Sequence, residues 1–434
     1  MRWFIKTFFT SIVLILFAAW YLPACYYNVF SCDDFWIGTN VRLYGFWGAQ
    51  KWHWLNWEGS FIYTFLATFP HVFNSMNVAP VFNIVTLGLL IFSVFYFIRA
   101  FCVLSKLKSL FIALYLVAVI FTLTRGSSEL RFWLSANLPY MVGVSSCILL
   151  VSFFHNTKRF TILNRCLSVI LCFFIVGNKI TYIFFACFCL LLYFLIYKQK
   201  NNLIFIFCMI FFFSMFNIFA PGNIVRLHEN VGQVSVVCFE MITCVASRVS
   251  TVLSSLPTMV LLVSALLPEK ACPLSISYFR IILIALVTIA YVVFDSIVMF
   301  MCFGNTGPIR TYLLPELALM FLAWILIRKI YFDINLDVLP FFKRGFVAVA
   351  LFLMIGLQIC ELQKLDETKL YSEKARIRNE MIKASRKGDC LRLDFLPPSG
   401  LLNSYYANDE SWILNVYLPY FDKATQCVIK ESDN

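Results

Sequence analysis

The stretch SCDDFWIGTN, Ser31 to Asn40, places two neighbouring carboxylates directly after the first apolar run of the chain. A carboxylate at a water boundary can act as a general base or ligate a metal ion. It can also cap a helix that begins near Phe35 and complement the helix dipole. Because one aspartate is enough for a cap, the pair favours catalysis, with Asp33 as the base and Asp34, nearer Phe35, as the cap.

The next polar stretch, KWHWLNWEGS from Lys51 to Ser60, is crowded with tryptophan and carries Glu58. Most of its indole rings are explained by a belt at the level of the lipid headgroups. An aromatic ring can also stack on the apolar face of a sugar while carboxylates accept its hydroxyl groups. We therefore expect Trp57 and Glu58, which stand beside Gly59, to lie at a binding site.

Two arginines follow short turns in later loops. In APGNIVR, proline and glycine make the turn and Asn223 tolerates a left-handed conformation, which leaves Arg226 unexplained. Arg310 follows GNTGP in the same manner. A planar guanidinium suits a phosphate group, so the pair could form a clamp for a phosphate or pyrophosphate. Contact with lipid headgroups alone remains an alternative.

The elements that position these residues must be membrane helices. Hydrophobic residues make up 61% of the chain and charged residues 13%, which exceeds what one soluble core can bury. Apolar runs predict an all-α polytopic protein of about eleven transmembrane segments, the first a retained anchor rather than a signal peptide. The segments are 4–27, 81–100, 107–124, 140–154, 166–176, 181–197, 203–220, 251–267, 281–302, 312–327 and 345–360.

Basic residues assign the two sides of the membrane. Lys and Arg gather in the short loops on the side of the N-terminus, which predicts a cytoplasmic N-terminus. The same distribution accounts for the net charge of +12 without a nucleic-acid partner. The opposite side then receives the loops 28–80, 125–139, 220–250 and 303–311, together with a C-terminal region, 362–434, that follows the transmembrane region 1–361.

Polar residues within the predicted helices are candidates for function. Asp295, Glu316 and Lys179 lie toward the outer ends of their segments. They could face a polar cavity, or Lys179 could form an ion pair with Asp295 and Glu316 that locks helices together. The segment 233–250 is expected to be an amphipathic helix in the outer interface.

Several other sites are excluded or restricted by the sequence. Most cysteines lie in apolar runs, and only Cys390 and Cys427 follow the last membrane segment, where an oxidising compartment would let them pair. The histidines are too scattered for a local zinc motif. The chain contains no phosphate-binding loop or Gly-x-Ser-x-Gly elbow, and the cytoplasmic loops are too short for a nucleotide-binding domain.

As an ordered set, these motifs resemble a bacterial family of multi-spanning glucosyltransferase-like proteins, similar in plan to the GT-C membrane glycosyltransferases that modify lipopolysaccharide O-antigen. The resemblance spans nearly the whole chain. Its elements are the acidic pair, Trp57–Gly59, the FWLSANLPYMVG stretch from Phe132 to Gly143, APGNIVR, Arg310 and SWILNVYLPY from Ser411 to Tyr420.

The resemblance implies transfer of a sugar, glucose in that family, from a polyprenyl-phosphate carrier to a periplasmic glycan acceptor at the bacterial inner membrane. Asp33 or Asp34 would activate the acceptor hydroxyl, and Arg226 and Arg310 would hold the carrier phosphate. Further substrate contacts are expected from Trp57, Glu58, Trp133, Asn137, Tyr140 and Asn223. The chain has Glu58 then Gly59 where many relatives have glycine then arginine, which leaves the contact made there open.

Other functions remain compatible with the sequence. A divalent cation such as Mg²⁺ or Mn²⁺, with Asp33 and Asp34 as ligands, would serve the same chemistry, and the sequence leaves its requirement open. An O-antigen polymerase or ligase would share the compartment and substrates. A lipid-linked-sugar transporter predicts functional residues on both faces and often repeated halves, neither of which the sequence contains.

Overall fold

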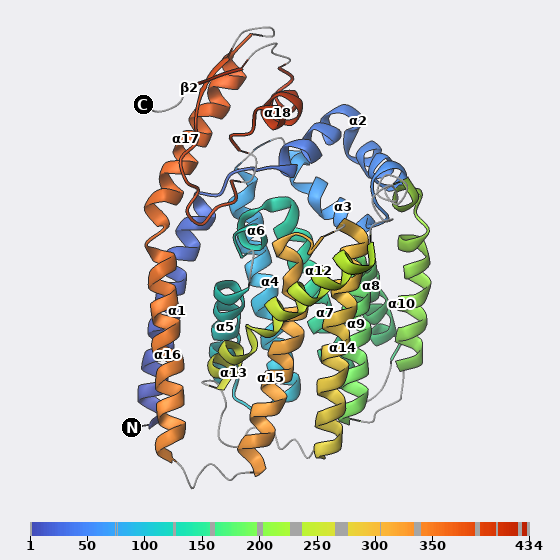
Figure 1. Cartoon of the computed structure of the whole chain (residues 1–434), viewed down its shortest axis with the longest axis vertical. Helices are drawn as coiled ribbons and strands as arrows, with labels where there is room; N and C mark the ends of the chain where they lie inside the picture. The colour runs from blue at the N-terminus through green and yellow to red at the C-terminus, as the bar shows by residue number, and fades with distance from the viewer. Residues whose placement is uncertain are drawn as a thin grey trace.

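The computed structural model describes residues 2–73, 75, 77–124, 127–156, 161–197, 203–225, 237–264, 277–303, 305–333, 340–386, 391–404, 407–423 and 428–431. Nearly all of them are helical, and the long helices run side by side as a bundle (Figure 1). The prediction of an all-α, multi-pass membrane protein is confirmed.

Within the described residues, eight helical segments are long and apolar enough to cross a membrane. They are α1 (Arg2–Tyr26), α4 (Val78–Phe101), α5 (Lys106–Leu123), α7 (Leu134–Asn156), α9 (Ile180–Tyr197), α14 (Tyr278–Phe303), α15 (Leu313–Asp333) after the 3₁₀ turn η3 (Ile309–Tyr312), and α16 (Pro340–Leu362), which α17 (Leu365–Ala384) extends.

The predicted count of about eleven spans is not confirmed, because three of the expected segments are short in the structure. Helix α8 (Ile162–Val176) has 15 residues and α10 (Leu203–Ile218) has 16. At 1.5 Å per residue, each covers less than the roughly 30 Å of a hydrocarbon core. The segment expected at 251–267 is divided between the end of α12 (Val237–Leu253) and α13 (Leu256–Ser264).

Helix α12 occupies most of the segment expected to be amphipathic and crosses α14 and α15 obliquely (Figure 1). Its Arg248 is completely buried and donates to the Asp295 carboxylate at 2.9 Å and to the Thr311 carbonyl at 3.0 Å. The expected pairing of Asp295 with Lys179 is therefore wrong. The sequence could not indicate that α12 turns its cation inward, where a buried carboxylate requires a partner.

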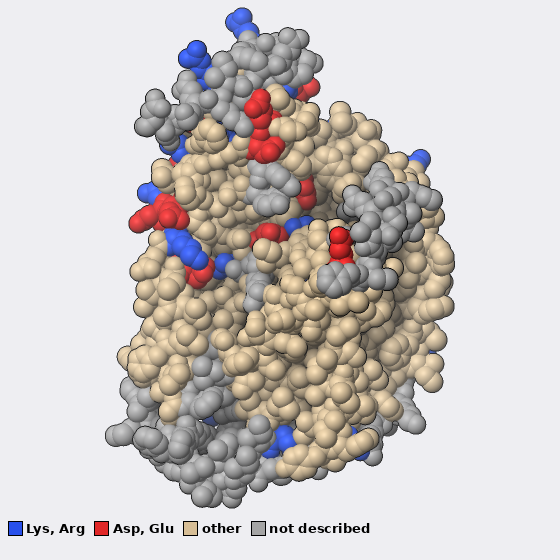
Figure 2. Space-filling model, in the orientation of Figure 1, with Lys and Arg blue, Asp and Glu red and all other residues tan. Residues whose placement is uncertain are grey.

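The loop motifs gather at the end of the bundle opposite the N-terminus (Figure 1). There α2 (Asp33–Asn56), α3 (Phe61–Thr68), the 3₁₀ turn η1 (Phe69–Phe73) and α6 (Ser127–Phe132) cover the long helices. Charged side chains cluster around a hollow in this end, while the body below it is mostly uncharged (Figure 2). This distribution matches an apolar belt in lipid and a polar end in water.

Helix α2 turns back on itself at Gly45, which has a left-handed φ of 70°. Along a straight helix, Trp36 and His53 would stand roughly 25 Å apart at 1.5 Å per residue. Their ring centroids are instead 5.1 Å apart, and the Trp57 ring lies 4.9 Å from that of Trp36. A side chain at Gly45 would strain this backbone, so glycine permits the fold that unites the two polar stretches.

The C-terminal region packs onto α2. It contains β1 (Leu391–Asp394), α18 (Glu410–Trp412), a π-helical turn (Ile413–Tyr417), α19 (Leu418–Tyr420) and β2 (Val428–Glu431), with β1 and β2 paired in parallel. Phe30 and Phe35 share one apolar cluster with Ile382, Leu393 and Tyr417. The region after residue 361 is thus packed against the first polar loop through a common core.

We predict a disulfide between Cys390 and Cys427, which lie outside the described residues. Leu391 and Val428, the next residues in the sequence, are register partners in β1 and β2. Closing such a loop stabilises a fold by roughly 3–4 kcal/mol in the chain-entropy model. Mass spectrometry of non-reduced peptides should recover the Cys390–Cys427 cross-link. Free thiols at both positions in protein isolated from membranes would contradict the prediction.

Candidate functional site

A cavity of about 280 Å³ lies between the two arms of α2, helix α3 and the C-terminal region. Asp33, His53 and Glu58 contribute polar groups to its wall, and Trp36, Trp57, Tyr63 and Trp412 contribute aromatic rings. The structure therefore brings Asp33, Trp57 and Glu58, three of the expected site residues, to one cavity.

The two neighbouring aspartates have different environments. Asp34 has no exposed surface, and its carboxylate accepts hydrogen bonds from the backbone N–H groups of Ser31 at 2.9 Å and Ser135 at 2.8 Å. Burial raises the pKa of Asp34 to about 7, against the opposing effect of these donors. The prediction that Asp34 caps α2 is wrong, because Cys32 is the N-cap and Asp34 instead joins the turn before α2 to the start of α7. Asp33 lines the cavity and Asp34 does not.

The backbone just before the pair is strained. Cys32 has φ of 47° and ψ of −122°, a conformation that residues other than glycine rarely adopt. Such strain persists where surrounding contacts impose it, and it concentrates at functional sites. Here the Asp34 carboxylate bridges back over Cys32 to Ser31 and thereby holds Asp33 at the first position of the helix.

Glu58 is buried and paired with Lys179. The Lys179 ammonium lies 2.6 Å from Glu58 Oε1 and 3.4 Å from the centre of the Tyr63 ring. Lys179 precedes α9, so this ion pair joins the end of the first polar loop to a transmembrane helix. This ion pair also explains why a glutamate stands between Trp57 and Gly59, because Glu58 neutralises a cation from a distant loop.

The Trp57–Gly59 turn packs backbone against backbone on Pro221–Asn223. The prediction of a turn at Pro221–Asn223 is wrong, because these residues begin a helical segment and Asn223 is not left-handed. A Cβ atom built on Gly59 would lie 2.0 Å from the Asn217 carbonyl oxygen, and one on Gly222 would lie 2.7 Å from the Glu58 nitrogen. Asn223 accepts from the Gly59 N–H at 2.9 Å and donates to the Asn217 carbonyl at 2.6 Å. The two motifs are therefore halves of one contact, and Asn223 acts within it as a structural clasp.

The stretch from Trp133 to Tyr140 supplies the other wall of the polar end. The Arg310 guanidinium lies 4.4 Å from the Trp133 ring centre, 2.8 Å from Glu129 Oε2 and against the Tyr140 hydroxyl. Asn137 is used differently: it donates to the Leu130 carbonyl at 2.7 Å and accepts from the Thr86 hydroxyl at 2.7 Å. It thus secures the break between α6 and α7.

Arg310 does not line the 280 Å³ cavity but lies near its wall, beside the residues around Tyr63. Tyr63 lies within electrostatic range of Asp33, Glu58 and Arg310. Cys32, directly before Asp33, lies within such range of Arg310 as well. Arg226, the second expected cation, lies outside the described residues. We use the term polar chamber for the cavity residues Asp33, His53, Glu58 and Tyr63 together with their neighbours outside the cavity wall, Glu129, Trp133, Tyr140, Lys179 and Arg310.

The SWILNVYLPY motif closes one side of the cavity. Trp412 lines the cavity, and the Tyr420 ring lies under the Arg42 guanidinium at 4.4 Å. A Cβ atom on Gly38 would lie 2.4 Å from the Tyr420 ring, so α2 needs glycine there to accept the motif. The last polar segment of the chain and the first therefore form one wall.

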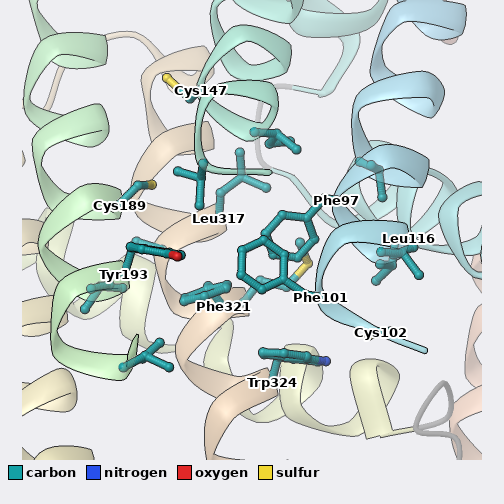
Figure 3. Close-up of a pocket in the computed structure, with 18 of the residues that line it drawn as sticks. Phe97, Phe101, Cys102, Leu116, Cys147, Cys189, Tyr193, Leu317, Phe321 and Trp324 are labelled. Atoms are coloured by element: carbon teal, nitrogen blue, oxygen red, sulfur yellow. The ribbon is translucent and has the colours of Figure 1, made fainter. Parts of the chain in front are cut away.

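A second cavity, of about 190 Å³, lies deeper among the transmembrane helices. Its wall is almost entirely apolar, with Phe97, Phe101, Phe321 and Trp324 around the space (Figure 3). Cys147 marks its upper end in the view. Since Cys147 follows Tyr140 by seven residues on α7, this cavity begins roughly 10 Å below the polar chamber.

The part of the chain that the structure describes contains no group of three or more His, Cys, Asp or Glu residues placed to hold a metal ion. Asp34, one of the two expected ligands, directs both carboxylate oxygens at backbone N–H groups. Its present geometry suits a structural carboxylate rather than a metal ligand.

Three members of the chamber, His53, Tyr63 and Glu129, were not singled out from the sequence. Lys179 was named as a candidate but was paired with the wrong acids. A histidine between two tryptophans in KWHW was the available signal for His53, because a polar ring in an aromatic segment needs a reason. Nothing local indicated that Lys179 would reach Glu58, 121 positions away.

No protein-family model matches the chain, and no curated protein matches it. The chemistry of the polar chamber therefore has to be inferred from its own residues.

We predict that Gly59→Ala destabilises the protein by about 1–3 kcal/mol or more, because the new methyl group would overlap a backbone oxygen that cannot move freely. Gly88→Ala is the matched control. Its Cβ would meet nothing within 4 Å on α4, and alanine favours a helix. Thermal unfolding in detergent measures both. A Gly59→Ala protein with the same melting temperature as the wild type would contradict the close backbone contact at Gly59.

Proposed function

We propose that the protein is a membrane glycosyltransferase that moves a sugar, glucose by its family resemblance, from a polyprenyl-phosphate carrier to a glycan acceptor such as lipopolysaccharide O-antigen. The observation that supports this best is the composition of the polar chamber. One accessible carboxylate, Asp33, lines its cavity, and an arginine, Arg310, lies beside that cavity at the end of an apolar helical bundle.

The two charged groups suit the two halves of a glycosyl transfer. Asp33 would take the proton from the acceptor hydroxyl as its oxygen bonds to the anomeric carbon of the donor sugar. The bond from that carbon to the phosphate oxygen breaks, and the lipid phosphate leaves. Arg310, held by Glu129 and Trp133, is positioned to offset the negative charge of the leaving phosphate.

The apolar cavity suits the hydrocarbon part of a lipid donor. It starts on α7 and α15, the helices next to Tyr140 and Arg310, and continues away from the polar chamber. A carrier whose phosphate contacts Arg310 could extend the more distant isoprenoid units of its tail among Phe97, Phe101 and Phe321 (Figure 3). A soluble sugar nucleotide would make no use of this space.

Asp33→Asn should lower transfer by roughly 10²–10⁴-fold, because the amide keeps the shape of the side chain but is no longer a base. Its thermal stability should remain that of the wild type. Purified protein would be incubated with polyprenyl-phosphate-glucose and O-antigen fragments, and the product identified by mass spectrometry. The exposed Asp366 provides the matched control, and Asp366→Asn should leave transfer unchanged.

Asp34→Asn separates the structural carboxylate from the catalytic one. Its amide NH₂ group would face a backbone N–H, so the free energy of unfolding should fall by about 1–3 kcal/mol.

Full transfer activity in folded Asp33→Asn protein would exclude Asp33 as the base. Transport of the lipid-linked sugar without any glycosidic product would replace the transferase by a transporter.

For the cellular arrangement we propose the bacterial inner membrane, a cytoplasmic N-terminus and a periplasmic C-terminus. Alkaline phosphatase fused after Asn434 should be active, because this enzyme requires an oxidising compartment. The basic loops at the N-terminal side motivate the expectation. Fluorescence of a cytoplasmic reporter at the same position, with an inactive phosphatase fusion, would place the polar chamber on the wrong side for a periplasmic acceptor.

A further inference from the structure

His53 is a buried polar group that the transfer chemistry above leaves unused. Its side chain lines the 280 Å³ cavity, and the residue is 2% exposed. Neither ring nitrogen has a hydrogen-bond partner among the residues that the structure describes. The rings of Trp36 and Trp52 stand nearly perpendicular to the imidazole at 5.1 and 5.2 Å and fix its orientation.

A buried neutral imidazole is fully satisfied by a ligand that offers an acceptor to one ring nitrogen and a donor to the other. Burial lowers the pKa of His53 to about 4, so the ring is neutral near pH 7, with one nitrogen as donor and the other as acceptor. A hydroxyl group complements either nitrogen. An ammonium group offers only donors and a carboxylate only acceptors, so neither complements both ring nitrogens as a pair of hydroxyl groups does.

The remaining wall of the cavity also favours hydroxyl groups over charges. Asp33 and Glu58 are both acidic, and none of the described residues that line the cavity is Lys or Arg. Lys179, the nearest cation, is engaged by Glu58. The cavity therefore accepts hydrogen bonds from hydroxyl groups and repels carboxylates and phosphates, which leaves Arg310 as the described cation for the donor phosphate.

Size and shape limit the ligand further. A volume of about 280 Å³ is just below the roughly 300–1,000 Å³ usual for small-molecule sites. Trp36, Trp57 and Trp412 offer apolar ring faces around it. Such a space suits one pyranose ring, whose apolar face stacks on an indole while its hydroxyl groups meet acceptors.

We infer that this cavity binds a single uncharged pyranose ring of the acceptor glycan, with His53 as a contact that determines specificity. The assignment of the ring to the acceptor rests on the proposed transferase. Binding of the sugar does not depend on it. The inference predicts that an acceptor whose terminal sugar is a uronic acid is a poor substrate, whatever the donor.

The test compares methyl α-glucopyranoside with methyl α-glucopyranosiduronate, which carries a carboxylate in place of the hydroxymethyl group. Binding to the purified full-length protein is measured by saturation-transfer NMR titration at pH 7. The neutral glycoside should bind at least about tenfold more tightly, a difference of roughly 1.4 kcal/mol. Equal binding of the two glycosides, or binding of neither, would overturn the inference. This comparison uses the wild-type protein alone.

Variants then locate the contact. His53→Phe keeps a ring of similar shape but no hydrogen-bonding group, and should weaken binding of the neutral glycoside roughly tenfold, as expected for one lost hydrogen bond. His53→Gln should retain most of the affinity. His71→Phe is the matched control, because His71 is also buried without a described partner but packs against Phe30 outside the cavity.

The outcomes separate the inference from the proposed function. A folded His53→Phe protein that binds the neutral glycoside as the wild type does would exclude His53 as the contact. Should His53→Phe not fold, loss of binding in His53→Gln would also count against it. Charge-selective binding without any transfer from polyprenyl-phosphate-glucose would retain the sugar site and reject the transferase. Transfer to uronate-ended acceptors as fast as to neutral ones would retain the transferase and reject the proposed sugar site.

Discussion

The close backbone contact between the turn at Gly59 and the helical segment at Gly222 fixes the position of Glu58 in the polar chamber. The backbones approach so closely that no side chain fits at either position, and Asn223 fastens them with a hydrogen bond. This contact holds Glu58 where Lys179 can pair with it, while the bend at Gly45 sets the second arm of α2 beside the first. Together the bend and the contact bring Asp33, His53 and Glu58 to one cavity.

Environment then divides the work of the two adjacent aspartates. Asp34 is buried and meets two backbone donors, so its carboxylate stabilises the fold at the junction of α2 and α7. Asp33 faces the cavity. The pKa of Asp34, near 7, would suit a general base, yet geometry comes first: a base must reach the proton that it removes. The strain at Cys32 reflects the same division, since Asp34 anchors the turn that presents Asp33.

The sequence predicted the helical membrane fold because long apolar runs have few other solutions. It also placed Asp33, Trp57, Glu58 and Arg310 at one end, since charge bias orders the loops. It failed where tertiary contacts decide. The inward turn of Arg248 and the pairing of Lys179 with Glu58 depend on packing between distant segments, and local patterns carry no such information. The predicted number of membrane spans was not confirmed either, because apolar runs that form helices of only 15 or 16 residues were counted as spans.

The central claim is that the polar chamber and the apolar cavity below it hold the two ends of one lipid-linked sugar. A cryo-electron microscopy structure of the protein with polyprenyl-phosphate-glucose tests it most directly. The account predicts density for the phosphate at Arg310, for the sugar near Asp33, and for isoprenoid units among Phe97, Phe101 and Phe321. A headgroup bound at the N-terminal end of the bundle, or a lipid that avoids both spaces, would contradict it.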